Sequence, residues 1–215
     1  YFPGISAGYL LSEEDFMKNL SWLSMVKIRA SYGMTGNNSV GRFDYQGLWH
    51  SSSPYNGAGT YIPTAIPNAA LTWESSGQVD AGLDLAFLNN RINVVFDYYN
   101  KTTRNLLFSD KLPNTSGFGS VDKNVGKVRF WGYETQIDVN IMTKKNFKWD
   151  IAANISYNMN KVLKLPDNGN YKNRMNGMEF ADDYYAGIGG IAEGERMYGV
   201  IGYKVSHILD NAEAA

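Results

Sequence analysis

The sequence predicts an all-β protein, an antiparallel transmembrane β-barrel of which this chain supplies a portion. Apolar and polar residues alternate with a period of two along several segments, as they do in half-exposed strands. The connections between these segments alternate between long and short, as in outer-membrane barrels. Charged residues make up 19% of the chain, below the roughly 25% of an average soluble domain, while Tyr (15) and Gly (22) are abundant. One face of the predicted sheet therefore need not meet water.

The composition excludes several classes of protein. Lys and Arg total 20 and Asp and Glu total 21, and this net charge of −1 argues against a nucleic-acid-binding surface. The chain has no Cys and only 2 His, which excludes disulfides, thiolate metal sites and multi-histidine sites, so we expect no metal or other cofactor. No apolar run reaches the length of a transmembrane helix. The chain begins with Tyr1 and shows no signal peptide, so we expect an internal stretch of a longer protein.

The first elements are a strand, a short helical segment and a second strand. Residues 4–11 alternate like a strand. Ser12 is a suitable N-cap with carboxylates in the turn that follows, so we expect a helical turn over 12–23. Residues 24–36 form the next strand, in which Val26, Ile28, Ala30 and Tyr32 alternate with Lys27, Arg29, Ser31 and Gly33.

The next two strands, 72–88 and 91–112, form a hairpin. Asn89-Asn90 connects them, because Asn tolerates the positive φ of a tight turn. Both strands exceed the 9–11 residues or so that cross a membrane, so they should project past the bilayer. Pairing across the turn sets apolar residues opposite one another, namely Phe87 and Ile92, Leu85 and Val94, Leu83 and Phe96, and Ala81 and Tyr98.

A second hairpin joins the alternating segments Tyr133–Ile141 and Lys148–Asn160 through a turn near Lys144-Lys145-Asn146. We expect Ile141 opposite Trp149, Val139 opposite Ile151 and Ile137 opposite Ala153. In a barrel, Ile92, Phe96, Ile151 and Ile155 should face lipid, while Asp97, Asp150 and Asn154 should face the lumen. We place Trp149, Tyr98 and Tyr133 near strand ends, where an aromatic girdle lies.

Loop length predicts the orientation. The long connections 37–71, 112–124 and 165–195 should share one end of the barrel and face outside. The short ones at 12–23, 89–90 and 143–147 should share the periplasmic end.

Few residues are candidates for a site. Trp49, Tyr55 and Tyr61 in loop 37–71 are our candidate substrate contacts, because aromatic rings stack on sugars; packing within the loop is the competing explanation. Other features are better explained without chemistry. A wet lumen lining explains the acidic residues Asp80, Asp84, Asp97, Glu134 and Asp138 better than acid–base catalysis does. A loop explains Gly187–Gly190 better than a phosphate site does, and a solvated loop explains Glu179, Asp182 and Asp183 better than a calcium site does. The two histidines, His50 and His207, are too isolated to catalyse. We therefore expect no enzyme.

Several segments, spread in order over nearly the whole chain, resemble the SusC/RagA family of TonB-dependent outer-membrane transporters. These are Lys27-Ile28-Arg29-Ala30-Ser31-Tyr32-Gly33-Met34-Thr35-Gly36-Asn37-Asn38, Pro67-Asn68-Ala69-Ala70-Leu71-Thr72-Trp73-Glu74, Gly82-Leu83-Asp84-Leu85 with Asn89-Asn90-Arg91-Ile92, Asp97-Tyr98-Tyr99-Asn100-Lys101, Asn124-Val125-Gly126-Lys127-Val128 with Gly132-Tyr133-Glu134, and Glu193-Gly194 with Gly202-Tyr203-Lys204. Each motif is weak alone, but together they are specific.

This resemblance implies a barrel of about 22 strands with a plugged lumen, of which residues 1–215 form a C-terminal portion. The plug and the TonB box would precede residue 1, and the final strands would follow the chain. The family imports nutrients such as oligosaccharides or peptides across the outer membrane of Gram-negative bacteria. It draws energy through TonB and works with a SusD-like surface lipoprotein.

Two alternatives remain open from the residues themselves. One is a small, self-contained structural or adhesive barrel in the outer membrane, since about eight strands can close. The other is a soluble all-β carbohydrate-binding module.

Overall fold

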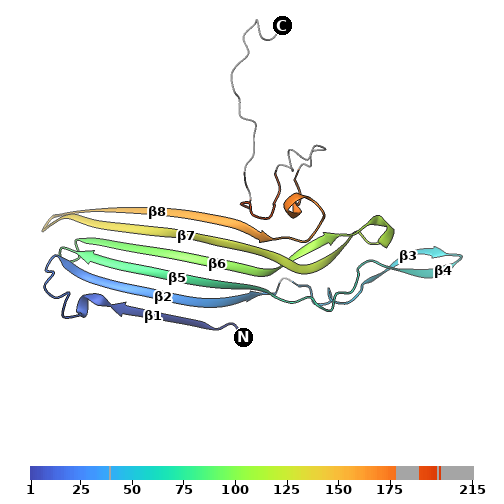
Figure 1. The fold of residues 1–215 in the computed structure, drawn as a ribbon, viewed down its shortest axis with the longest axis horizontal. Coiled ribbons are helices and arrows are strands. Elements are labelled where there is room, and N and C mark those ends of the chain that lie inside the picture. The colour runs from blue at the N-terminus through green and yellow to red at the C-terminus, as the bar shows by residue number, and fades with distance from the viewer. Residues whose placement is uncertain (39, 178–188, 198, 200–215) are drawn as a thin grey trace, which may run out of the picture.

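The computed structural model describes residues 1–38, 40–177, 189–197 and 199. Six long strands form one antiparallel sheet in the order β1-β2-β5-β6-β7-β8, and β3 and β4 form a separate two-stranded sheet (Figure 1). The strands of the main sheet are β1 (Gly4–Leu10), β2 (Leu23–Asn37), β5 (Glu74–Phe87), β6 (Ile92–Lys111), β7 (Ser120–Lys144) and β8 (Phe147–Lys164). The sheet is open, with β1 and β8 at its two edges.

The hairpin of β5 and β6 has the predicted register. Phe87 pairs with Ile92, and the pairs down to Ala81 and Tyr98 all match the prediction. Asn89 and Asn90 have φ values of 56° and 63°, and Leu88 before them has 53°. The turn therefore uses two consecutive residues that tolerate the left-handed region, as a tight hairpin requires.

The hairpin of β7 and β8 corrects one predicted pair. Val139 pairs with Ile151 and Ile137 with Ala153, as expected, but Trp149 pairs with Met142 and not with Ile141. A register shift between Asn140 and Met142 inserts one extra residue into β7. Such a bulge moves the following residues by one position, so Met142 takes the place predicted for Ile141.

The helical turn expected over 12–23 is wrong. The segment holds only the 3-10 turn η1 (Leu11–Glu13). It continues as successive turns in which the amides of Glu14, Met17, Leu20 and Leu23 each donate to the carbonyl three residues earlier. A segment this short gains little from an α-helix without a packed apolar face, and β1 and β2 need only a tight reversal here.

Register pairs extend across the sheet in rows, and successive rows belong alternately to its two faces. One row joins Ile28, Leu83, Phe96, Thr135 and Ile155, and the next joins Arg29, Gly82, Asp97, Glu134 and Ser156. On β6 and β8 the predicted division between the two faces is confirmed: Ile92, Phe96, Ile151 and Ile155 share the apolar face, and Asp97, Asp150 and Asn154 share the polar face.

The apolar face has the height of a membrane band. It extends from the row of Val79 to the row of Phe87, which are eight residues apart on β5. At about 3.4 Å per residue this is about 27 Å along the strand. A tilt of about 40° reduces it to about 21 Å, and the flanking side chains bring it close to the roughly 25 Å band of outer-membrane barrels.

Aromatic side chains border this band. Trp22 stacks on Phe87 near the short turns, at 5.8 Å between ring centroids. Toward the other end, Tyr133 stacks on Tyr157 at 5.4 Å. Tyr98 and Tyr133 lie one row inside this end of the band and not at strand ends, because β6 and β7 continue well beyond them to Lys111 and back to Ser120.

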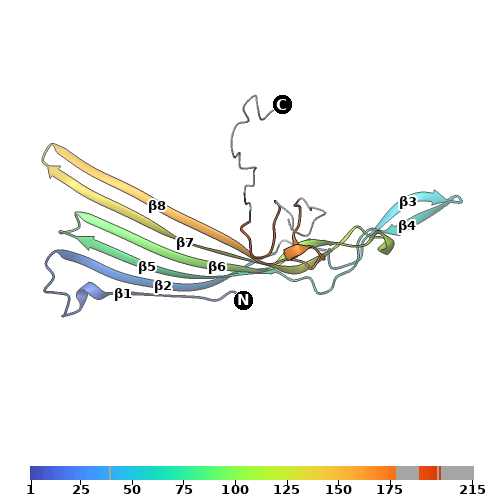
Figure 2. The ribbon, with the colours of Figure 1, turned by 45° about the horizontal axis from the view of Figure 1, so that its top comes forward.

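Figures 1 and 2 show that the connections after β2, β6 and β8 lie toward one end of the sheet, and the turns after β1, β5 and β7 at the other. The shared ends were predicted, but two loops differ from expectation. β7 already begins at Ser120, so loop 112–124 is shorter and holds η2 (Asn114–Ser116). Loop 37–71 contains a hairpin of β3 (Trp49–Tyr55) and β4 (Ala58–Pro63).

Candidate functional site

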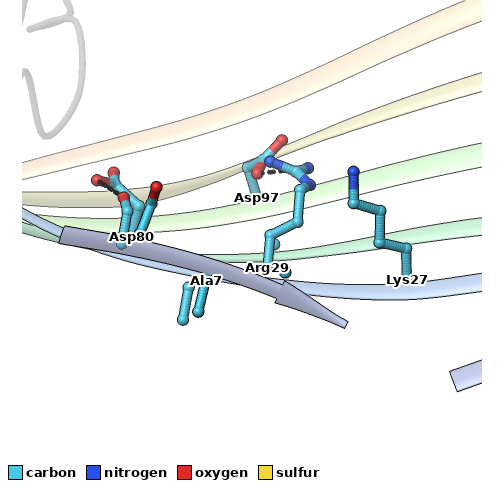
Figure 3. Close-up of a pocket in the computed structure, with 10 residues that line it drawn as sticks. Ala7, Lys27, Arg29, Asp80 and Asp97 are labelled. Carbon is cyan, nitrogen blue, oxygen red and sulfur yellow. Dashed lines mark hydrogen bonds and ion pairs between the residues drawn. The ribbon is translucent and has the colours of Figure 1, made fainter. Parts of the chain in front are cut away.

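The polar face carries an ion-pair network centred on Arg29 of β2. Its Nη2 atom lies 2.7 Å from Oδ1 of Asp84 on β5 and 2.9 Å from Oδ1 of Asp97 on β6. The Arg29 Nε–H also donates to the Asp84 carboxylate at 3.0 Å. One guanidinium therefore links three neighbouring strands on this face, and Figure 3 shows its contact with Asp97.

Gly82 makes the longer of these links possible. It lies on β5 between Arg29 and Asp97 in the same row. A Cβ at this position would come within 2.6 Å of Asp97 Oδ1 and 2.7 Å of Arg29 Cζ. Because Gly82 has no side chain, the guanidinium of Arg29 can extend across β5 to Asp97.

Gly132 has the same role in the adjacent row of the polar face. It lies on β7 between Tyr99 of β6 and Asn158 of β8, and the Tyr99 hydroxyl donates to Asn158 Oδ1 at 2.7 Å. A Cβ on Gly132 would come within 3.0 Å of both side chains and would overlap the backbone oxygen of Tyr157. Two glycines thus let polar side chains bond across an intervening strand.

Polar side chains also line two shallow depressions on this face. In one, of about 310 Å³, Arg29, Asp80 and Asp97 rise from the same side of the sheet, and Ala7 points away from it (Figure 3). The other, of about 500 Å³, is lined by residues that include Gln78 and Lys101. Ser31 and Gln78 donate to Asp80 at 3.0 and 2.6 Å. The face thus presents hydroxyl, amide and carboxylate groups suited to hydrogen-bonding a polar solute.

The connection after β8 is built around a buried arginine. Arg174 is 6% exposed and donates to the carbonyl of Gly189 at 2.6 Å and to Glu195 Oε1 at 2.8 Å. Lys172 Nζ lies 3.1 Å from the same Glu195 oxygen. Burial opposes ionisation of the Glu195 carboxyl, but hydrogen bonds from Lys172 and Arg174 outweigh it, so the pKa of Glu195 lies below its ordinary value.

This connection folds onto the sheet beyond the apolar band. The amide of Val162 on β8 donates to the Glu195 carbonyl at 2.9 Å, and the amide of Gly194 donates to the Val162 carbonyl at 2.8 Å. Val162 and its partner Val128 are at most 1% exposed, as are Leu165 and Ala192. A cavity of about 520 Å³ lies between the end of β6 and this connection, lined by residues that include Asp110, Lys111, Asn168 and Arg174.

The predicted aromatic contacts Trp49, Tyr55 and Tyr61 all lie on the β3–β4 hairpin, with 66%, 80% and 72% of their surface exposed. Tyr61 pairs with Ser51, two residues from Trp49, so Trp49 and Tyr61 share a face. A register shift between Ser52 and Tyr55 places Tyr55 on the other face. The hairpin therefore presents two aromatic rings together and one apart.

The other residues considered from the sequence do not come together in a site among the described residues. His50 is exposed on β3. Glu179, Asp182, Asp183, His207 and Gly187–Ile188 lie outside the described residues. Over the described part of the chain, no group of three His, Cys, Asp or Glu side chains is arranged to hold a metal ion. No helix among the described residues is long and apolar enough to cross a membrane.

Sequence reasoning missed three structural residues of this site. The bridging roles of Gly82 and Gly132 depend on which strands become neighbours, and alternation within one strand does not reveal this. Arg174 lies in a segment without periodicity. The β3–β4 hairpin did carry a signal, Asn56-Gly57, which is typical of tight hairpin turns.

Comparison with known proteins shows which family of proteins this chain is similar to. The family model described as TonB dependent receptor-like, beta-barrel, matches residues 1–200. The chain is 36% identical over 203 residues to TonB-dependent receptor P39 of Formosa agariphila, covering 94% of this chain and 18% of that protein. It is 35% identical over 172 residues to TonB-dependent receptor SusC of Bacteroides thetaiotaomicron, covering 76% of this chain and 17% of SusC. The chain thus spans less than a fifth of the length of these relatives.

Solved structures agree. The RagAB peptide importer in its open-open state superposes with a TM-score of 0.71 at 28% identity, covering 79% of this chain and 18% of that one. In its closed-closed state the TM-score is 0.70 at 26% identity, covering 89% and 20%. The SusC/RagA resemblance and the predicted barrel architecture are both confirmed. The family consists of receptors and transporters of the outer membrane of Gram-negative bacteria, and not of enzymes. The chain belongs to the TonB-dependent receptor-like β-barrel family.

Proposed function

We propose that this chain forms a section of the barrel wall of a nutrient importer in the outer membrane. Residues 1–215 would belong to the C-terminal half of a larger barrel, with the plug, the TonB box and the final strands elsewhere in the protein. Import would draw on energy delivered through TonB. The transported solute would be an oligosaccharide or a peptide, and a SusD-like lipoprotein would act as partner at the cell surface.

The observation that carries this proposal is the separation of the two sheet faces. An apolar band of membrane height lies on one face, and the Arg29 network with the neighbouring polar rows lies on the other. A soluble carbohydrate-binding module would bury the apolar face in a core, but here Ile151 and Ile155 are 46% and 60% exposed. A self-contained small barrel would close on itself, whereas β1 and β8 are unpaired with each other.

Similarity supports the partner and the class of solute. SusC and RagAB are among the relatives of this chain, and the RagAB structures are described as a peptide transporter and importer. The long-connection end, which carries the β3–β4 hairpin, would face the lipoprotein and the solute. Trp49, Tyr55 and Tyr61 remain our proposed contacts there, because they are exposed and aromatic rings stack on sugars and on peptide side chains.

A growth and uptake assay in the bacterium that carries the gene tests the import function. Deleting the gene should abolish growth on one class of oligosaccharide or peptide, and disrupting TonB should give the same defect. The partner lipoprotein should co-purify with the intact receptor in detergent. A receptor that takes up its solute normally without TonB would contradict the proposal, and so would a protein that stays soluble and monomeric without detergent.

Replacing Trp49, Tyr55 and Tyr61 together with Ala tests the contacts separately. Uptake and binding should fall while the receptor stays folded in the outer membrane. Matched Ala substitutions at exposed Tyr1, Phe16 and Tyr171 serve as a control for general loss of aromatic surface. If the triple variant transports normally, the contact assignment fails and the import function stands.

A further inference from the structure

We call the face of the sheet that carries the apolar band its outer face. Beyond the aromatic border of the band, this outer face changes from apolar to basic. Two successive rows of this face carry cations on three neighbouring strands. Lys127 of β7 pairs with Arg104 of β6 on one side and with Lys164 of β8 on the other. In the next row of the same face toward the band, Arg129 pairs with Lys161. We call these five residues the outer basic cluster: Arg104, Lys127, Arg129, Lys161 and Lys164.

The cluster has no counter-charge among the described residues. None of its members forms an ion pair there, although seven ion pairs form elsewhere. The register partners that continue these rows on β5 and β6 are uncharged, for example Ser75 and Thr102. Neighbouring strands lie only about 4.8 Å apart, and like charges directly opposite each other destabilise a sheet. Five adjacent cations therefore call for an external anion.

Arg129 connects the cluster to the aromatic border. Its guanidinium lies over the ring of Trp131, 5.0 Å from the centroid, and its Nε–H donates to Asn100 Oδ1 at 2.9 Å. These contacts orient the planar head of Arg129 and leave its two terminal amino groups without a partner among the described residues. A planar guanidinium held in this way suits bidentate binding of a phosphate.

The cluster lies at the depth of lipid headgroups. Tyr and Trp side chains gather at the membrane–water interface. On the outer face, the row of Tyr98, Tyr133 and Tyr157 and then the row of Trp131 form the end of the apolar band, and the row of Arg129 comes next. Counting outward from the hydrocarbon, the side chains are thus aliphatic, then aromatic, then basic.

We propose that the outer basic cluster binds the phosphate groups of a phosphorylated glycolipid in the outer leaflet of the outer membrane. The inference rests on the proposed placement of the long-connection end outside the cell, because the cluster lies toward that end. The bound phosphates would relieve the repulsion among the five cations and would fix the depth and tilt of this section of the barrel wall.

Lipid retention by the intact receptor tests the proposal. The receptor is purified from its own outer membrane in mild detergent, and phosphorylated glycolipid is counted per barrel by mass spectrometry. A variant with Lys127→Gln and Lys161→Gln should retain about 25-fold less, since each cation near a membrane surface contributes about a factor of five. Its matched control carries Lys144→Gln and Lys145→Gln, two exposed cations at the short-turn end, and should retain as much lipid as the unmodified receptor.

Two further arms identify the ligand. Delipidated receptor should rebind the phosphorylated glycolipid but not its dephosphorylated form, and millimolar inorganic phosphate should not displace it. Equal retention by the two variants would overturn the proposal, as would equal rebinding of the dephosphorylated lipid. Heat-modifiable migration in electrophoresis shows that each variant is folded. Retention is measured without transport, so a failure of the import function would not be mistaken for a failure of lipid binding.

Discussion

At the scale of single residues, the polar face depends on two glycines that leave room for neighbouring side chains. Gly82 allows Arg29 to reach Asp97, and Gly132 allows Tyr99 to reach Asn158. The two positions differ in what a side chain would meet. At Gly82 a Cβ meets the ends of flexible side chains, whereas at Gly132 it meets the backbone oxygen of Tyr157.

Gly132→Ala should therefore destabilise the folded barrel more than Gly82→Ala. Overpacking against fixed backbone costs about 1–3 kcal/mol. Displacing a partly exposed ion pair costs roughly 0–1 kcal/mol, since the Arg29 and Asp97 side chains are 34% and 42% exposed and water screens their interaction. Urea unfolding of the receptor in lipid vesicles measures both. Gly33→Ala is the control, because nothing lies within 4 Å of a Cβ there. A Gly82 variant that is less stable than the Gly132 variant would contradict this account.

A second effect at this scale concerns Glu195 and pH. Its pKa is lowered in the folded protein. At pH values above 4.5, the ordinary pKa of glutamic acid, its ion pairs with Lys172 and Arg174 therefore stabilise the connection after β8. This stabilisation is lost as the pH falls through the lowered value. The neighbouring Glu193 accepts hydrogen bonds from the Leu165 amide and Asn173 and also faces this group.

Hydrogen exchange at the Val162 amide should report this loss. Because that amide donates to the Glu195 carbonyl, its protection should decrease at acid pH after correction for the intrinsic rate. Glu195→Gln should remove the pH dependence, while Glu193→Gln should leave it in place. The amide of Val139, inside the sheet, is the internal control. Unchanged protection of Val162 down to pH values well below 4.5 would refute the role of Glu195.

At the scale of elements, the strands show what a sequence can reveal. Alternation and the Asn89-Asn90 turn determine the register of β5 and β6, because a one-residue shift would reverse every pair on the apolar face. The same reasoning missed the bulge before Met142, because Ile141 and Met142 are both apolar and either could lie opposite Trp149. The Ser12 cap suggested a helix, but a local cap does not outweigh the tight reversal between β1 and β2. In the candidate site, alternation predicts the correct face for the polar residues. It does not reveal which side chains contact one another across strands, such as Arg29 and Asp97.

Ile155→Arg tests the assignment of the faces. Ile155 lies in the row of Leu83, midway between the rows of Val79 and Phe87, so it should be near the bilayer midplane. Arg at that depth should cost about 2–4 kcal/mol of unfolding free energy in vesicles. Ser156→Arg is the matched control, since Ser156 is the next residue on the same strand and pairs with Glu134 on the polar face. Equal costs for the two substitutions would show that the faces are assigned wrongly.

At the scale of the whole molecule, the sheet lacks a core of its own. Among the described residues few apolar side chains are buried: Val26, Ala86, Val128, Val162, Leu165, Pro166 and Ala192. In an aqueous globular domain such a sheet would expose both edges and a wide apolar face, which promotes edge-to-edge pairing. The strands instead suit a setting in which lipid covers one face and further strands cover the edges.

The orientation of the barrel follows from the ends of these strands and can be tested with single cysteines. The chain contains no native Cys, so one introduced thiol is the only label site in this segment. Asn56→Cys, at the tip of the β3–β4 hairpin, should react with a membrane-impermeant maleimide on intact cells. Asn146→Cys, in the turn between β7 and β8, should react only after the outer membrane is permeabilised. The reverse pattern would place the long connections in the periplasm and contradict the proposed surface contacts.

The 215-residue chain on its own should consequently not be an independently stable fold. Without lipid or further strands, the free edges of β1 and β8 and the exposed side chains of the apolar band are open to other chains, and each sheet can extend by pairing with another. Expression of residues 1–215 in aqueous buffer should therefore give aggregates, and detergent should be needed to disperse them. Light scattering with and without detergent makes the comparison, and urea titration tests for cooperativity. A soluble monomer that unfolds in one cooperative transition would show that these strands can bury their apolar face by themselves, and would favour a self-contained domain over a section of barrel wall.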